Sequence, residues 1–293
     1  MFLGPKKKTP VPYRLVRPDT CLTGVVFASP HSGRQYPSDF LRATQLDALA
    51  IRSSEDAFVD LLIEDAPRLG APLMLSRVPR AYVDLNRSAD ELDPALVTGV
   101  RRVAHNPRVT SGLGVIPRVV ANGRAIYRGK LSLTEARRRI AKYWQPYHSV
   151  LDDLLREQRA LFGKAVLVDC HSMPHEAIGG FTRSNAPTPE VVLGDRFGAS
   201  ADTEIVDRIE AAFAAEGLRV GRNAPFAGAY IAQQYGRPAQ RQHCVQIELD
   251  RALYMDEATM EQKPEFAEVQ RMMTRIMAEI VDIGRIELPV AAE

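Results

Sequence analysis

The sequence predicts an α/β protein, because short apolar runs typical of buried strands alternate with segments of helical periodicity. The clearest strand-like run covers residues 165–168 and ends in a cluster of polar side chains. The clearest helix-like segment covers residues 201–216, where apolar side chains recur at helical spacing and Gly217 follows. The chain has 293 residues, of which 45% are hydrophobic and 25% charged, so we expect one large domain rather than two.

The stretch at residues 165–174, which reads AVLVDCHSMP, places chemically active side chains where the predicted strand ends. The alternation of side chains along a strand puts Asp169 and His171 on one face and Cys170 on the other. In open α/β sheets, ligands bind outside the carboxyl ends of the strands. We therefore expect the functional site here and take His171 as its first candidate residue.

Two other predicted strands are also followed by polar side chains. The β-rich run at residues 23–29 leads into His31, and a run at residues 81–86 finishes at Asn86 and Arg87. A further short strand is expected at residues 73–76, just before the second of these. These strand ends supply more candidates for the same site.

The last predicted strand, residues 244–250, alternates regularly between apolar and polar side chains. One face would feed the core and the other would present Glu248. A carboxylate in the middle of a strand must be paired, bound to a metal or catalytic. The structural alternative is an ion pair between Glu248 and Arg251.

Helical segments are expected between these strands. Ser53 and Asp56 resemble a capping arrangement, which would place Glu55 and Asp56 at a helix amino terminus. Loops near the site are expected at residues 172–189 and 223–238, and residues 93–130 form an irregular excursion with a turn at Asn122–Gly123. The expected helices cover residues 38–50, 57–69, 132–145, 146–161, 201–216 and 264–286.

Composition argues against several classes of partner. The net charge of +2 is too small to indicate a nucleic-acid partner, and no apolar run is long enough to span a membrane. The first residues do not read as a signal peptide, and Lys6–Lys8 is expected to be a frayed, solvated terminus. Three cysteines without CxxC spacing favour reduced thiols and a cytoplasmic location. The oligomeric state stays open.

Two histidines at strand ends together with a carboxylate have the composition of a catalytic zinc site. Taken singly, a histidine such as His31 or His171 is more often a hydrogen-bonded structural residue than a metal ligand. The remaining histidines lack a second ligand nearby or, for His243, are expected to point away from Glu248; they are His105, His148, His175 and His243.

An ordered set of motifs resembles the N-formylglutamate amidohydrolase family. The resemblance runs from about residue 24 to residue 257, which is nearly the whole globular chain. Between residues 174 and 198 the sequence departs from the pattern of the family. This departure leaves open which acyl group and which amino acid make up the substrate. The motifs are PHSG at 30–33, ED at 55–56, PRAYVDLNR at 79–87, YWQPYH at 143–148, DCHSMP at 169–174, LGDRFG at 193–198, PFAGAYI at 225–231, YGRP at 235–238 and VQIELDRALYMDE at 245–257.

The resemblance implies a fold like that of zinc carboxypeptidases and aspartoacylases, with a central mixed β-sheet flanked by helices. It divides the chain into an N-terminal extension at residues 1–20 and a single α/β domain at residues 21–293.

The resemblance also implies roles for individual residues. One zinc ion per chain would be held by His31, His171 and Asp56, with Glu55 as the alternative acidic ligand. Glu248 would be the general base. The substrate carboxylate would be bound by Asn86 and Arg87, with Arg183 and Arg237 as weaker candidates.

The resulting hypothesis is a zinc-dependent amidohydrolase that converts N-formyl-L-glutamate to formate and L-glutamate, a reaction that the resemblance links to histidine degradation. The partner would be a small N-acyl amino acid, with neither nucleic acid nor membrane involved. One alternative is a zinc hydrolase of another N-acyl amino acid or a short peptide, and another is a non-catalytic binder of metal or carboxylates. A thiol hydrolase using Cys170 is least favoured, because His171 would point away from it.

Overall fold

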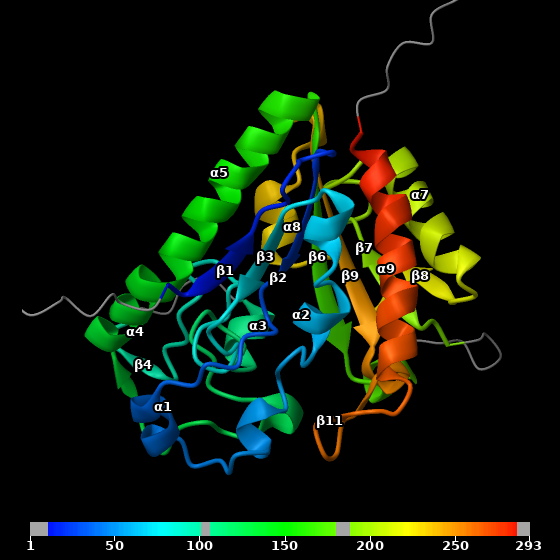
Figure 1. Cartoon of the computed structure of the whole chain (residues 1–293). Coiled ribbons are helices and arrows are strands. Elements are labelled where there is room, and N and C mark those ends of the chain that lie inside the picture. The colour runs from blue at the N-terminus through cyan, green and yellow to red at the C-terminus, as the bar shows by residue number, and fades with distance from the viewer. Residues whose placement is uncertain (1–10, 101–105, 180–187, 286–293) are drawn as a thin grey trace, which may run out of the picture.

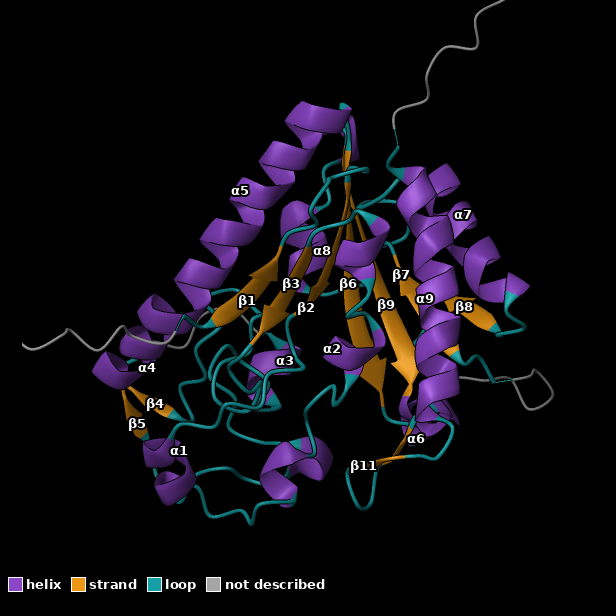
Figure 2. Ribbon diagram, viewed as in Figure 1, coloured by secondary structure: helices purple, strands orange, loops and turns teal. Residues whose placement is uncertain are grey.

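A seven-stranded mixed β-sheet forms the centre of the computed structural model, which describes residues 11–100, 106–179 and 188–285 (Figures 1 and 2). The strand order is β1-β3-β2-β6-β9-β7-β8. The four middle strands β3, β2, β6 and β9 are parallel, so their carboxyl ends meet at one edge. The strands are β1 (Tyr13–Val16), β2 (Val25–Ser29), β3 (Leu73–Ser76), β6 (Ala165–Met173), β7 (Val191–Gly194), β8 (Val220–Arg222) and β9 (Gln242–Asp250).

The antiparallel strands lie toward the sides of the sheet. β1 runs antiparallel to β3, and β7 runs antiparallel to β9. This mixed sheet with helices around it confirms the predicted fold class. One boundary needs correction: residues 13–16, which we assigned to an N-terminal extension, form a strand of the sheet.

Each face of the sheet is covered by its own helices (Figure 1). One face, with Val168 and Ile247, packs against α2, α7 and α9. The opposite face, with Leu167 and Cys244, packs against α5 and α8 and against the long excursion that follows β3. These helices are α2 (Val59–Leu62), α5 (Gln145–Phe162), α7 (Thr203–Ala215), α8 (Tyr230–Tyr235) and α9 (Phe266–Ile283).

Several predicted elements differ from the structure. Residues 81–86 form turns instead of a strand, because the amides of Tyr82 and Val83 both donate to the carbonyl of Pro79. The apolar side chains there are buried by the surrounding loops. The sequence pattern therefore indicated burial correctly but not the strand that we inferred from it. The helix expected at residues 38–50 is shorter, because Thr44 pairs with Tyr127 after α1 (Ser38–Ala43).

The helix expected at residues 57–69 is also interrupted. It consists of α2 and a separate 3-10 turn, Ala66–Leu69, and its first cap position is Phe58 in a left-handed conformation (φ 66°). Asp56 is therefore not a capping residue; it lies before this turn and points into the interior of the protein. The left-handed conformation of Phe58 separates Asp56 from the helix, so the Asp56 carboxylate is available for other contacts.

The helices before β6 run on without the break expected at Pro146. A π-helical turn, Ile140–Trp144, joins α4 (Leu133–Arg139) to α5, and Pro146 lies at the start of α5, where its missing amide hydrogen is tolerated. The predicted cap at Ser132 is present, since its hydroxyl accepts from the amide of Glu135. The loop expected at residues 223–238 contains α8, and the remaining short elements are β4 (Val97–Thr98), α3 (Pro107–Thr110), β5 (Leu131–Ser132), α6 (Glu176–Gly179), β10 (Met255–Asp256) and β11 (Glu261–Gln262).

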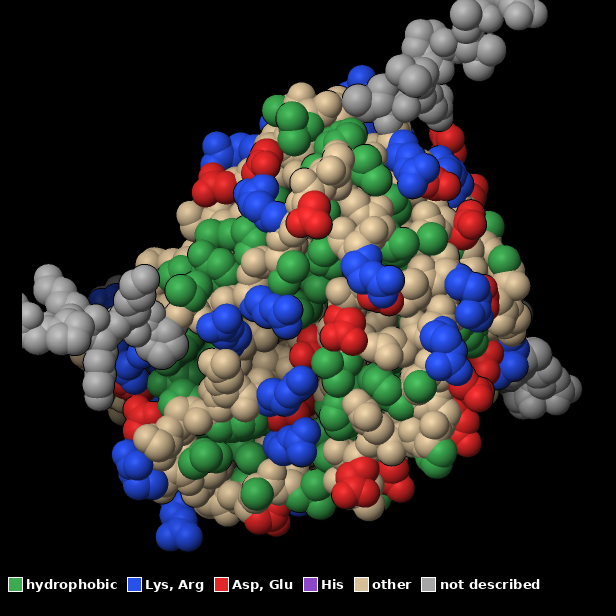
Figure 3. Space-filling model, in the orientation of Figure 1, with side chains coloured by type: hydrophobic (Ala, Val, Ile, Leu, Met, Phe, Trp, Pro, Cys, Tyr) green, Lys and Arg blue, Asp and Glu red, His purple; other side chains and the backbone are tan. Residues whose placement is uncertain are grey.

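The surface carries charges of both signs. On the face shown in Figure 3, basic and acidic side chains are interspersed with apolar ones. Within the described ranges, no helix combines the length and the apolar character needed to cross a bilayer. The Lys6–Lys8 run lies outside the described residues.

Candidate active site

A cavity of about 620 Å³ lies where β2, β6 and β9 end. His31 follows β2, while His171 and Glu248 sit near the ends of β6 and β9, and all three line the cavity. Its outer walls come from residues 108–123 and 225–229. The cavity thus lies at the edge of the sheet that the sequence predicted for the site.

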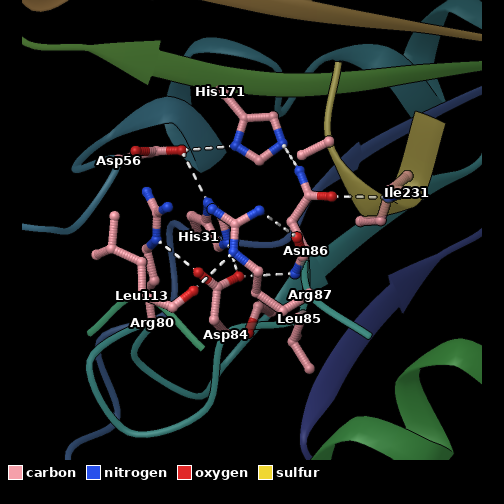
Figure 4. Close-up of polar contacts among 12 residues, drawn as sticks. His31, Asp56, Arg80, Asp84, Leu85, Asn86, Arg87, Leu113, His171 and Ile231 are labelled. Carbon is pink, nitrogen blue, oxygen red and sulfur yellow. Dashed lines mark hydrogen bonds and ion pairs between the residues drawn. The ribbon is translucent and has the colours of Figure 1, made fainter. Parts of the chain in front are cut away.

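His31, Asp56 and His171 lie close together, and the two histidines line this cavity (Figure 4). Their ligand atoms all lie within 4.8 Å of one another, and each residue is at most 2% exposed. Asp56 Oδ2 is 2.8 Å from His171 Nδ1 and 3.5 Å from His31 Nδ1. We call these three residues the His-Asp-His cluster; they are the three that the sequence comparison assigned to a metal.

Each histidine of the cluster contacts a further carboxylate through Nε2, the ring nitrogen that does not face Asp56. His31 Nε2 lies 2.7 Å from Asp84 Oδ1, and His171 Nε2 lies 3.0 Å from Asp169 Oδ2. When Nε2–H donates to these carboxylates, both Nδ1 atoms are left unprotonated, which is the usual arrangement behind histidine ligands of metals.

The donor set fits a divalent metal ion. Two imidazole nitrogens and one carboxylate oxygen converge, which is a common ligand set of catalytic zinc. His31 Nδ1 is buried and has no hydrogen-bond partner among the described residues. A buried polar atom without a partner is unfavourable, and a bound cation would satisfy it.

Electrostatics at the cluster favour a positive charge. Burial by itself would raise the pKa of Asp56, but the hydrogen bond with His171 and the close approach and charges of both histidines outweigh it and hold that pKa well below its usual value. Burial opposes charge on His171 too, yet the carboxylates of Asp169 and Asp56 raise its pKa well above the usual range. A cation at this point would interact favourably with the same carboxylates.

Asp56 is oriented by an arginine from the end of β9. Arg251 Nη2 donates to Asp56 Oδ1 at 3.2 Å, which leaves Oδ2 facing the histidines. Glu55, the alternative acidic ligand, points elsewhere, because Tyr36 and Arg52 donate to its carboxylate.

Glu248 lies beside the cluster in the neighbouring strand. It pairs in register with His171, and its carboxylate Oε1 accepts a hydrogen bond of 2.8 Å from Gln246 Nε2. Burial raises the pKa of Glu248 to about 7; the charge of Asp56 acts in the same direction and that of His171 opposes it. A carboxylate that exchanges a proton near neutral pH suits general acid–base chemistry.

Asn86 connects the cluster to α8. Its Nδ2 lies 3.1 Å from His171 Nε2, 3.4 Å from Asp169 Oδ2 and 3.5 Å from Gln246 Oε1. Its Oδ1 accepts from the amide of Ile231 at 2.7 Å. The residue is buried, and its hydrogen bonds with Asp169, Gln246 and Ile231 fix its side chain.

Arg87 lines the cavity and is mostly buried. Its Nε donates to the carbonyl of Leu113 at 3.0 Å, and its Nη1 donates to the carbonyl of Asn86 at 3.3 Å. Burial lowers the pKa of Arg87 from its usual value, against the opposing charge of Asp84.

Of the other two candidate arginines, the structure describes Arg237, which is not brought into this cavity. Arg237 is exposed, its Nε donates to the carbonyl of Gln234, and it does not line the cavity. Arg183 lies outside the described residues. Cys170 lies on the opposite face of β6 from His171, and burial raises the pKa of its thiol well above the usual value.

The glycine of the PHSG segment permits a close approach beside the cluster. A Cβ atom at Gly33 would lie 2.2 Å from the carbonyl oxygen of Val78, a distance that no side chain tolerates. Glycine at this position therefore lets the loop after β2 pack against the segment that leads to Asp84.

Sequence reasoning did not assign a role to several residues of the site. The alternation within DCH placed Asp169 on the face of His171, and the alternation in β9 placed Gln246 on the face of Glu248, so both signals were available. No comparable local signal pointed to the residues that reach the cavity from other segments. These are Arg80 and Arg108. Arg251, considered above as an ion-pair partner of Glu248, pairs with Asp56 and Glu257 instead.

Comparisons with known proteins identify the family of this chain. The model of the N-formylglutamate amidohydrolase family matches residues 23–255. The chain is 32% identical over 265 residues to an N-formylglutamate deformylase of Pseudomonas aeruginosa, covering 87% of this chain and 91% of that protein. It is 30% identical over 240 residues to an N-formylglutamate deformylase of Pseudomonas putida, covering 80% and 82%.

A solved structure extends the comparison to three dimensions. The crystal structure of an N-formylglutamate amidohydrolase from Ralstonia eutropha superposes with a TM-score of 0.88 at 36% sequence identity, covering 94% of this chain and 99% of that one. Family match, sequence identity and fold agree over most of the chain. The protein therefore belongs to the N-formylglutamate amidohydrolase family of enzymes, which hydrolyse linear amides.

Proposed function

We propose that this protein is a metal-dependent hydrolase that converts N-formyl-L-glutamate and water to formate and L-glutamate. The observation that carries the proposal is the His-Asp-His cluster with Glu248 beside it, in a chain of this family. The two relatives named N-formylglutamate deformylase support the choice of substrate.

The proposed metal is one zinc ion per chain, held by His31, Asp56 and His171. When bound, zinc would lower the pKa of a water molecule and polarise the formyl carbonyl. Asp84 and Asp169 hold the two imidazole rings in the tautomer that such an ion requires, and Arg251 holds the Asp56 carboxylate.

Glu248 is the proposed general base. Gln246 occupies its Oε1 atom, which leaves Oε2 to accept a proton from the attacking water. The water oxygen forms a bond to the formyl carbon and the C–N bond breaks. Glu248 then returns the proton to the departing nitrogen, which yields formate and a free amine.

Arg87, with Asn86 beside it, is the proposed binding site for the carboxylate next to the amide. Hydrogen bonds to two backbone carbonyls fix its guanidinium, while its Nη2 atom has no hydrogen-bond partner in the described part of the chain. A planar guanidinium held this way offers charge-assisted hydrogen bonds to a carboxylate.

A cytoplasmic location in histidine degradation is the cellular setting that we propose. Cys21, Cys170 and Cys244 are free thiols, which suits a reducing compartment. The family resemblance supports the pathway.

Formate release from N-formyl-L-glutamate tests the reaction, with N-acetyl-L-glutamate and a short peptide as comparison substrates. We expect formylglutamate to be preferred. Glu248→Gln, which keeps the side-chain shape, should reduce kcat by about 100- to 10,000-fold while metal content is retained. Glu261→Gln, at an exposed position in β11, is the matched control. Activity on another substrate alone, or full activity of Glu248→Gln, would contradict the proposal.

A further inference from the structure

The arginines that line the cavity differ in how their charge is balanced. Arg80 Nε donates to Asp84 Oδ2 at 3.0 Å. Arg251 contacts Asp56 at 3.2 Å and Glu257 at 3.5 Å. These two guanidinium groups are therefore neutralised by carboxylates of the protein.

Arg87 and Arg108 are balanced less closely. The ion pair of Arg87 among the described residues is a long one to Glu91, at 4.0 Å between Nε and Oε2, and the charge of Asp84 also acts on it. Arg108 lies on α3, lines the same cavity and makes no side-chain hydrogen bond or ion pair with any described residue. Burial is the main cause of the lowered pKa of Arg87, and the positive charges of Arg80 and Arg108 act in the same direction.

Hydrogen bonds of the helix cap hold the backbone of Arg108 in place. Asn106 caps α3, because its Oδ1 accepts from the amides of Arg108 and Val109 at 3.0 and 3.4 Å. Beyond α3 the cavity wall becomes apolar, which suits the methylene groups of an aliphatic side chain. The apolar residues of this wall are Leu113, Pro117, Val119 and Val120.

The two arginines reach the cavity from different parts of the chain. Arg87 directly follows Asn86, whose Nδ2 is 3.1 Å from His171 Nε2, so Arg87 adjoins the place where the amide is cleaved. Arg108 reaches the cavity from an exposed helix that belongs to the outer wall.

We propose that Arg87 and Arg108 form a two-point site for dicarboxylates, in which Arg87 binds the carboxylate next to the amide and Arg108 binds the side-chain carboxylate. Arg108 is then the residue that selects N-acyl derivatives of acidic amino acids over neutral ones. The inference rests on the proposed function and deepens it, because it names the residue that recognises the acidic side chain.

Kinetics with N-formyl-L-glutamate and N-formyl-L-glutamine measure this selection, since the second substrate replaces the side-chain carboxylate by a neutral group of similar shape. In Arg108→Gln, the ratio of the two kcat/KM values should fall about 10- to 100-fold, mainly through a higher KM for formylglutamate. Arg108→Lys should restore part of the ratio, because it keeps the charge but not the planar fork.

Arg124→Gln is the matched control. Arg124 is exposed and adjoins cavity residues Asn122 and Gly123, but it does not line the cavity itself. The ratio should be unchanged in this variant. An unchanged ratio in Arg108→Gln, or an equal loss for both substrates, overturns the inference.

Calorimetric binding of L-glutamate and L-glutamine provides a readout independent of turnover. Arg108→Gln should weaken binding of glutamate selectively. If the unmodified protein failed to hydrolyse formylglutamate but showed this selective effect, only the proposed reaction would be wrong. If it hydrolysed formylglutamate but Arg108→Gln affected both ligands equally, only the role of Arg108 would be wrong.

Discussion

Gln246 is the residue that ties the proposed base to the rest of the site. Its amide nitrogen donates to Glu248, and its amide oxygen accepts from the backbone of Ala229 at 3.0 Å. The side chain is 3% exposed, so its hydrogen bonds form in a water-poor environment. Gln246 is therefore a positioning residue that holds the carboxylate in one orientation.

Replacing Gln246 by Leu should keep the side-chain volume but remove the donor to Glu248. The ionised form of Glu248 then loses a hydrogen bond, so its pKa rises. Because a general base must be deprotonated, the acid limb of the kcat/KM profile should move to higher pH, and kcat should fall about tenfold with little change in KM. Steady-state kinetics across pH check this.

The exposed Gln233→Leu, on α8, is the control for this experiment. A folded Gln246→Leu protein with an unshifted acid limb would show that Gln246 does not act on Glu248.

Residue patterns in the sequence located part of this site. A histidine after each of two apolar runs and the alternation in β9 indicated His31, His171 and Glu248, and the family resemblance added Asp56. The structure brings these residues together at one edge of the sheet. Arg108 gave no comparable signal, because an isolated arginine in an irregular segment carries no periodicity that indicates its direction.

α5 and the π-helical turn just before it hold the segment that carries Asn86 and Arg87. His148 Nε2 donates to the carbonyl of Leu85 at 2.9 Å, and Trp144 Nε1 donates to the carbonyl of Arg87 at 2.8 Å. His148 also bonds to the hydroxyl of Tyr235 in α8 at 2.8 Å. The helix thereby anchors a stretch without regular structure on the sheet face that carries the site.

His148 should make the free energy of unfolding depend on pH. Burial lowers the pKa of His148 to about 4. The unfolded chain binds this proton near pH 6.5, so the contribution is present above that pH and is lost as the pH falls from about 6.5 to 4, by about 3 kcal/mol in full. Urea unfolding at several pH values should show a smaller loss of stability over this range in His148→Gln.

His175→Gln is an informative control because its sign is opposite. The hydrogen bond to Asp250 raises the pKa of the exposed His175, so its contribution is present at low pH and is lost as the pH rises through the folded pKa. An identical pH dependence in His148→Gln and the unmodified protein would contradict the role of His148.

Element boundaries were harder to predict than element types. The parallel strands and the long helices α5, α7 and α9 follow from strong apolar patterns, which tertiary packing reinforces. The segment at residues 81–86 has the apolar content of a strand, but its backbone bonds locally to Pro79. Sequence shows that such residues are buried, yet it does not show whether a sheet or a loop buries them.

On the scale of the whole molecule, the His-Asp-His cluster joins parts of the chain that are distant in sequence. Its members follow β2, precede α2 and end β6. An ion bound there would interact with the folded chain far better than with the unfolded one, in which the ligands are dispersed.

Metal removal should therefore destabilise the fold. Dialysis against a chelator should lower Tm, and added Zn²⁺ should restore it, with a gain of about 2.7 kcal/mol when free metal is 100-fold above Kd. His171→Ala should abolish the response, whereas His175→Ala, which lies outside the cluster, should retain it. Elemental analysis should give about one metal per chain. Metal retained by His171→Ala, or a Tm that ignores the chelator, would contradict the assignment.

The groups proposed for catalysis and those proposed for substrate selection lie on different parts of the chain. The groups proposed for chemistry sit on or next to central parallel strands, where a change of position would disturb the whole sheet, whereas Arg108 and the apolar wall belong to surface segments. Substitutions in those segments can redirect the enzyme to another amide and leave bond cleavage intact. We therefore expect substitutions that change substrate preference in this family to occur mainly in residues 106–123. Mutant libraries aimed at a new substrate should target the same residues.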